Sequence, residues 1–227
     1  MPYPLDMSTQ KPHWLKPHEG EHRLPVAIVV AIVILLQFSL PVSLSLSFQS
    51  WICALEIFIL IGLYAVSPNR ISRHHSFTRI IGFALTTVMT ISNSASAVKL
   101  VAELISGGIG TATQLLASGG SIWLTNIVIF SLWFWDLDRG GPGARAEAKR
   151  EWPDFMFPQM ADSSYSPSDW HPKFFDYLYM SFTNASAFSP TDVLPLTRWA
   201  KLLMLLQSTT SLIVVGLVVA RAVNILH

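Results

Sequence analysis

The sequence predicts an all-α integral membrane protein with about five transmembrane helices plus a short re-entrant, pore-type helix and loop before the last helix. Charged residues make up 13% of the 227 residues, against about 25% in soluble domains, and hydrophobic residues make up 51%. The charges also leave four long gaps, at 24–55, 80–98, 104–135 and 202–220. A helix needs roughly 20 apolar residues to cross a bilayer, and every gap reaches or nearly reaches that length.

The N-terminal part is expected to hold three spans. Residues 1–24 form a polar tail rich in Pro, His and charge. The apolar run that follows is too long for one helix, and the polar stretch at 47–50 divides it into a helical hairpin. A third span at 77–105 follows a short basic loop and ends at a cluster of glycines. The N-terminal membrane region is therefore expected at 25–111.

The C-terminal region, 112–227, has a different pattern. It opens with a span that ends near residue 135, and a polar, Pro-rich loop follows at 136–172. The next apolar stretch is aromatic but too short to cross a membrane, which predicts a re-entrant hairpin at 173–192. The last helix is expected at 196–226.

Enzymatic chemistry is not indicated. No histidine lies within an expected span, and no H-E-x-x-H, G-x-S-x-G or P-loop pattern occurs, so we predict a non-enzyme without a cofactor. A net charge of +1 gives no reason to expect a nucleic-acid partner. His18 and His22 are a candidate metal pair only if their stretch is helical, and a solvated tail is the alternative.

Four ionisable residues lie within or close to the spans: Glu56, Lys99, Glu103 and Arg221. Charges are costly in lipid, so these intramembrane groups are candidates for a functional role facing protein or water. Lys99 and Glu103 are four residues apart, which also allows a structural ion pair on one helix face. The small polar residues of the third span indicate either close helix packing or a water-filled path.

The segment before the last helix contains a recognisable series of residues. These are Asp192, Pro195, Thr197, Trp199, Ala200 and Lys201, with Gly216 further along. The series resembles the pore region of two-helix potassium channels, where Asp, Pro, Thr, Trp, Gly and Arg have the same spacing and the inner helix often has a glycine. The resemblance covers about the last hundred residues and implies a pore helix, a filter-like loop and a fourfold homo-oligomer.

The filter itself departs from that family. By the resemblance, the filter-like positions are Ser186, Ala187, Phe188, Ser189, Pro190, Thr191 and Asp192. Potassium filters direct successive backbone carbonyls at the ion and use glycines to do so, whereas Pro190 fixes its own φ and restricts Ser189. We therefore expect altered or absent potassium selectivity.

The whole chain also resembles a family of uncharacterised bacterial integral membrane proteins, through segments 138–142, 157–159 and 176–192. This resemblance implies a bacterial inner membrane and no particular activity. The loops rich in Lys and Arg place the N-terminus and the 136–172 loop in the cytoplasm by the positive-inside rule. A potassium-channel hairpin would instead lie on the outer face, so the two indications of orientation conflict.

Two functional hypotheses follow. The first is a pore-loop protein that conducts or gates small ions without potassium selectivity. The second is a non-catalytic accessory subunit at the edge of a larger membrane complex that contacts lipids or pigments through aromatic faces. The bilayer is a partner in both. Asp192 belongs to the constriction under the first hypothesis, and otherwise caps the last helix or braces Thr197.

Overall fold

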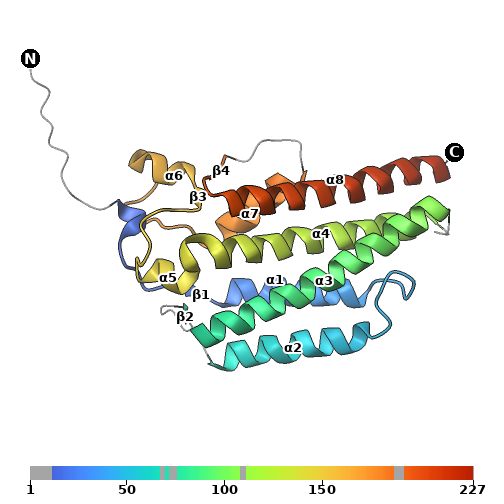
Figure 1. The fold of residues 1–227 in the computed structure, drawn as a ribbon, viewed down its shortest axis with the longest axis horizontal. Coiled ribbons are helices and arrows are strands. Elements are labelled where there is room, and N and C mark those ends of the chain that lie inside the picture. Colours follow the sequence, from blue (N-terminus) through green and yellow to red (C-terminus); the bar gives the residue numbers. More distant parts are fainter. Residues whose placement is uncertain (1–11, 67–69, 72–75, 108–110, 187–191, 227) are drawn as a thin grey trace, which may run out of the picture.

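The protein is a bundle of helices that run side by side, with a small folded cap at one end (Figure 1). This computed structural model describes residues 12–66, 70–71, 76–107, 111–186 and 192–226. Four of its helices are long and apolar enough to cross a membrane. They are α2 (Gln49–Val66), α3 (Ser76–Ser106), α4 (Ala112–Leu137) and α8 (Arg198–Leu226). The predicted all-α membrane fold is confirmed to this extent.

The expected first span is shorter than predicted. Helix α1 (Leu24–Phe38) has 15 residues, about 22 Å at a rise of about 1.5 Å per residue, against a hydrocarbon core of about 30 Å. Pro41 explains the early end, because a proline lacks the amide proton and disfavours helical backbone at the residue before it. Turns at 39–48 then lead to α2. The break in the hairpin therefore begins at Ser39, and four helices of membrane-spanning length stand where the sequence predicts about five, with α1 as a shorter apolar helix.

Helix α4 is the centre of the bundle, in contact with α1, α3, α7 (Phe174–Ser186) and α8. Polar side chains link it to its neighbours. Asn93 on α3 donates to the Ile122 carbonyl at 3.3 Å, and Asn126 on α4 donates to Ser211 Oγ on α8 at 3.1 Å. Hydrogen bonds and small residues hold membrane helices together where water provides no driving force. Asn93, one of the polar residues of α3, thus serves helix packing.

Helix α7 is a half-length helix between α4 and α8, and it begins at the same end of the bundle as α8 (Figure 1). Its 13 residues are too few to cross a membrane. Ser181 Oγ donates to the Ile127 carbonyl of α4 at 2.6 Å, and Gln207 Nε2 of α8 donates to Ser181 Oγ at 2.6 Å. The strand that precedes α8 lies back at the end where α7 starts, so the chain enters and returns on one side.

The cap closes that end of the bundle. It consists of α5 (Pro142–Ala146), α6 (Pro158–Ala161), 3₁₀ turns at His13–Leu15, Asp138–Gly140 and Ser163–Tyr165, and two short antiparallel strand pairs. β1 (Glu21–His22) pairs with β2 (Arg70–Ile71), and β3 (Phe155–Met156) pairs with β4 (Leu194–Pro195). The expected irregular loop at 136–172 therefore contains a compact folded unit that receives the N-terminal tail.

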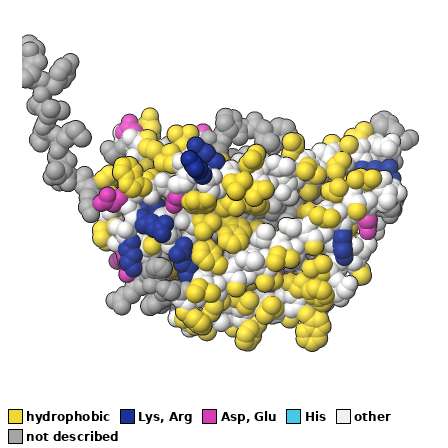
Figure 2. Space-filling model, in the orientation of Figure 1, with side chains coloured by type: hydrophobic (Ala, Val, Ile, Leu, Met, Phe, Trp, Pro, Cys, Tyr) yellow, Lys and Arg dark blue, Asp and Glu magenta, His cyan; other side chains and the backbone are white. Residues whose placement is uncertain are grey.

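Most of the Lys and Arg residues lie around this cap, which we call the basic end. On the face in Figure 2 they gather at the end that carries α5, while apolar side chains cover the helices. Lys99 and Arg221 lie toward the opposite end. The basic loops on which the sequence-based orientation rests therefore lie at one end of the bundle, and α7 starts from that same end.

Gly119 permits the close approach of α4 and α8. A Cβ added at Gly119 would lie 2.6 Å from Val218 Cγ2, whereas one at Gly120 would meet no atom within 4 Å. We expect Gly119→Ala to destabilise the fold by about 1–3 kcal/mol through overpacking. Thermal unfolding in detergent, followed by tryptophan fluorescence, measures the effect. Gly120→Ala is the matched control and should unfold at or above the wild-type temperature; equal behaviour of both variants would contradict the close packing.

Candidate functional site

A buried ion pair organises the basic end. Arg145 on α5 is 1% exposed, and its Nη2 donates to Glu21 Oε1 at 3.0 Å. Its Nη1 donates to the backbone carbonyls of Trp135 and Asp138 at 2.6 and 3.0 Å. Burial alone would lower the pKa of this guanidinium, but Tyr177, Glu21 and Asp138 raise the pKa of Arg145 above its usual value. Arg145 is therefore a permanent cation inside the protein.

Glu21 connects three parts of the chain. Its Oε2 accepts hydrogen bonds from Trp135 Nε1 on α4 and from the backbone N–H of Phe174, both at 2.9 Å. Phe174 is the first residue of α7, where backbone N–H groups lack partners within the helix. The carboxylate thus neutralises Arg145 and also satisfies a donor at the start of α7.

Two buried aspartates continue the network. Asp138 accepts from Tyr177 Oη at 2.5 Å and from the backbone N–H of Asp154 at 2.9 Å. Asp154 accepts from the backbone N–H of Arg139 at 2.9 Å and from Trp199 Nε1 of α8 at 3.0 Å. These contacts fix the cap to α7 and α8. Buried carboxylates with this many donors act as structural anchors.

A turn with left-handed backbone connects α4 to α5. Arg139, Gly140 and Gly141 have φ values of +52°, +85° and +93°. A Cβ at Gly141 would lie 2.9 Å from the Asp136 carbonyl oxygen, so only glycine fits there. The buried Arg139 side chain holds the turn, because it donates to the Arg150 and Trp14 carbonyls. The turn places Gly140–Ala144 as one wall of a cavity.

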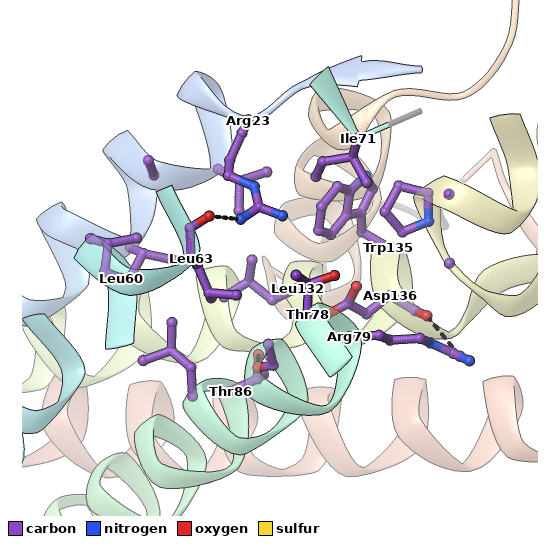
Figure 3. Close-up of a pocket in the computed structure, with 18 of the residues that line it drawn as sticks. Arg23, Leu60, Leu63, Ile71, Thr78, Arg79, Thr86, Leu132, Trp135 and Asp136 are labelled. Atoms are coloured by element: carbon purple, nitrogen blue, oxygen red, sulfur yellow. Dashed lines mark hydrogen bonds between the residues drawn. The ribbon is translucent and has the colours of Figure 1, made fainter. Parts of the chain in front are cut away.

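The cavity has a volume of about 90 Å³ and lies between the cap and the ends of four helices (Figure 3). Apolar side chains from α1, α2, α3 and α4 form most of its lining: Val26, Val30, Leu60, Leu63, Leu85 and Leu132. Trp135 contributes its ring and connects the cavity to the Glu21 network. The site therefore combines an apolar wall with a polar rim.

Three charged side chains face this cavity: Arg23 before α1, Arg79 on α3 and Asp136 on α4 (Figure 3). Arg23 donates to the Leu63 carbonyl. Arg79 Nη2 makes a long hydrogen bond of 3.4 Å to the Asp136 carbonyl, and its buried Nε has no hydrogen-bond partner. In the described parts of the chain, no salt bridge joins either arginine to Asp136. The cavity lining thus includes a guanidinium N–H without an acceptor. Its two arginines and one aspartate carry a formal net charge of +1.

The candidate metal pair is not supported by the local structure. The stretch containing His18 and His22 is not helical, and His22 lies in β1. His18 instead stacks on His171, with ring centroids 3.7 Å apart. Burial and the neighbouring His171, Arg145, Arg139 and Lys173 lower the pKa of His18 to about 4. The two rings therefore pack as neutral groups near physiological pH.

The four ionisable candidates lie apart from the cavity. Glu56 is fully buried in α2, a helix that packs against α1 and α3. The expected Lys99–Glu103 ion pair is absent among the described salt bridges, because Lys99 Nζ donates to the Ser45 carbonyl. Lys before Glu is also the weaker order on a helix. Arg221 Nη2 reaches the Gly107 carbonyl at 3.5 Å.

Most of the filter-like positions cannot be placed, because residues 187–191 (Ala187, Phe188, Ser189, Pro190 and Thr191) lie outside the described residues. Ser186 ends α7, and its hydroxyl donates to the Thr183 carbonyl at 3.0 Å. Asp192 is exposed. The expected brace between Asp192 and Thr197 is not formed, since Thr197 Oγ1 is buried without a hydrogen-bond partner.

The cavity and the network were not predicted from the sequence. Arg23 and Arg79 counted there only as basic residues for orientation, and Glu21 and Arg145 are separated by 124 positions. The one available signal was the Gly140-Gly141-Pro142 sequence directly after a charged pair, which is typical of a constrained turn. No protein-family model, curated protein or solved structure matches the chain.

The buried ion pair yields a stability prediction. Glu21→Gln leaves Arg145 buried without a counter-ion, and we expect a loss of about 3–5 kcal/mol. Thermal unfolding in detergent measures it. The control is Glu19→Gln, which removes the exposed Glu19–Arg70 ion pair and should change stability by less than about 1 kcal/mol. Equal losses in the two variants would refute the organising role of Glu21.

Proposed function

We propose that this protein is a non-catalytic, multi-pass membrane protein that binds the headgroup of an anionic lipid in the cavity at its basic end. The observation on which this proposal rests is the Arg79 side chain, which lines the cavity and whose buried Nε has no hydrogen-bond partner. A buried donor without an acceptor is costly, and a phosphate oxygen would satisfy it. Arg23 provides a second guanidinium at the same cavity.

The charge of the cavity favours an anion. Asp136 offsets one of the two arginines, and Arg145 behind it is already neutralised by Glu21. One positive charge remains for an incoming phosphate. Basic pockets between transmembrane helices on the cytoplasmic side are a common form of anionic-lipid site.

The walls of the cavity favour a lipid over free phosphate. Leucine and valine side chains from four helices line the cavity below the arginines. Such an apolar surface can contact the first methylene groups of acyl chains, whereas it offers an inorganic ion no polar contact. The site also lies where the helices end and the basic cap begins, which is the level of the headgroups in a bilayer.

This role agrees with an accessory subunit in a bacterial inner membrane, with the N-terminus in the cytoplasm. Glu21 and Asp138 each accept several internal hydrogen bonds, and Arg145 donates to Glu21 and to two backbone carbonyls, which favours a structural role over acid-base catalysis. A hydrogen-bonded cap beside a positively charged cavity suits a protein that binds anionic lipid headgroups.

The lipid proposal predicts the effect of removing one donor. Arg79→Gln should weaken binding of phosphatidylglycerol about tenfold, because one charge-assisted hydrogen bond is lost. Native mass spectrometry of the protein in mild detergent measures the bound fraction. Arg198→Gln, an exposed arginine at the same end, should leave binding unchanged. Equal binding of phosphatidylcholine, or equal binding of inorganic phosphate, would refute a site for an anionic lipid.

The re-entrant course of the chain supports a second candidate function, ion conduction through an oligomer. Helix α7 enters beside α8, stops at Ser186, and the chain is back at the same end by β4. A pore helix and filter loop would also start and return at one end, and the resemblance to potassium channels supports this candidate. Against it, Ser181 and Asn184 bond to α4 and α8 of their own chain, so these polar groups are not free to line a pore.

A cross-linking experiment separates the two candidates. If four copies surround a common pore, Asp192→Cys in a Cys53→Ser background should form disulfide-linked dimers in membranes under mild oxidation, since each chain then has one thiol. Trp51→Cys, exposed on α2, is the control and should remain monomeric. Equal cross-linking of the two variants would contradict a pore formed by the 186–192 segments.

A further inference from the structure

Glu56 is an isolated carboxylate in the middle of the apolar bundle. It lies seven residues into α2, about 10 Å along the helix from Gln49, and its side chain is 0% exposed. Neither carboxylate oxygen has a hydrogen-bond partner, and the described salt bridges do not include Glu56. A buried ion without a partner is among the most costly features in a membrane protein.

The Gln37 side chain interacts with the Glu56 carboxylate and connects it to two further polar side chains. Gln37 on α1, Gln49 on α2 and Ser92 on α3 are all buried. Ser92 Oγ donates to Gln37 Oε1 at 3.3 Å and to Gln49 Oε1 at 3.1 Å, and Gln49 Nε2 donates to Gln37 Oε1 at 3.1 Å. Gln37 Nε2 has no partner. The cluster therefore has both an unsatisfied carboxylate and an unsatisfied amide in one small space.

The charged groups of the surrounding helices are occupied elsewhere. Lys99 on α3 donates to the Ser45 carbonyl, Arg79 to the Asp136 carbonyl, and Arg23 to the Leu63 carbonyl. Glu103 lies near the far end of α3, and Asp136 faces the cavity at the basic end. The nearest other titratable group is the Cys53 thiol, whose sulfur is 3.7 Å from Gln49 Nε2. No cationic side chain in the described residues neutralises Glu56.

We propose that Glu56, Gln37, Gln49 and Ser92 form an intramembrane site for one monovalent cation, a proton or Na⁺. A single negative charge in a low-dielectric interior is balanced by a single positive charge, which excludes divalent ions on electrostatic grounds. Carboxylate, amide and hydroxyl oxygens are the ligands that hard cations prefer.

The glutamine side chains adapt the site to its occupant. Rotation of an amide about its terminal torsion exchanges oxygen for nitrogen at nearly the same position. Gln37 can therefore direct its amide nitrogen at an ionised Glu56, or its oxygen at a protonated Glu56 or at Na⁺. Ser92 turns its hydroxyl in the same way. The site reorganises by side-chain rotation alone, without movement of α1, α2 or α3.

Labelling with a hydrophobic carbodiimide tests this proposal, because such reagents modify protonated carboxyl groups inside membranes. The full-length protein is labelled in mild detergent between about pH 5 and 10, with and without Na⁺, and the peptide that contains Glu56 is quantified by mass spectrometry. A proton site gives labelling that falls with rising pH and ignores Na⁺. A Na⁺ site gives labelling that Na⁺ suppresses and K⁺ does not.

Two variants sharpen the experiment. Ser92→Ala, which removes one ligand, should shift the midpoint of protection by about one pH unit or about tenfold in Na⁺. Glu103→Gln, at the far end of α3, should leave the labelling of Glu56 unchanged. The proposal is overturned if Glu56 is not labelled at any pH, or if its labelling responds to neither pH nor Na⁺. An unchanged midpoint in Ser92→Ala would remove Ser92 from the site.

Discussion

The salt bridge between Arg145 and Glu21 is the contact on which the basic end depends. Arg145 draws the ends of α4 and the following turn together through two carbonyls, and Glu21 brings the N-terminal tail and α7 to the same point. Neither charge is accessible to water, so each is stable only in the presence of the other. This contact also helps to position the cavity wall, because Trp135 donates to Glu21 and lines the cavity.

The protein contains two buried groups of polar side chains whose carboxylates differ in the number of hydrogen bonds that they accept. In the cap, Asp138 accepts from three donors, and the surrounding arginines are bonded to carbonyls and carboxylates. Between α1, α2 and α3, the Glu56 carboxylate makes no hydrogen bond within 3.5 Å, although the Gln37 side chain lies close enough to interact with it. Proteins tolerate an unsatisfied group of this cost mainly where a ligand or proton completes it. This difference indicates a structural role for the carboxylates of the cap and favours Glu56 as the group that binds a ligand or proton.

Sequence patterns predicted the helices well because apolar length is a local property. The ranges expected for α3, α4 and α8 differ from the observed ones by at most two residues at either end. Pro41 was visible but its effect on α1 was underestimated. The cap escaped prediction for another reason: Glu21, Trp135, Arg145 and Phe174 meet only in three dimensions, and composition describes their segments simply as polar. Arg23 and Arg79 likewise lie far apart in the sequence, and only the packing of α1 and α3 brings both to one cavity.

The hydrogen bond from Phe174 to Glu21 has a consequence for biogenesis. Helix α7 receives a cap at its first turn from a residue that leaves the ribosome 153 positions earlier. Glu21 can therefore make its bonds to Trp135 and Arg145 before the chain reaches Phe174, and the bond to α7 can form only after all of these segments have been synthesised. The hydrogen bond between Glu21 in the tail and Phe174 of α7 is therefore one of the last contacts of the basic end to form.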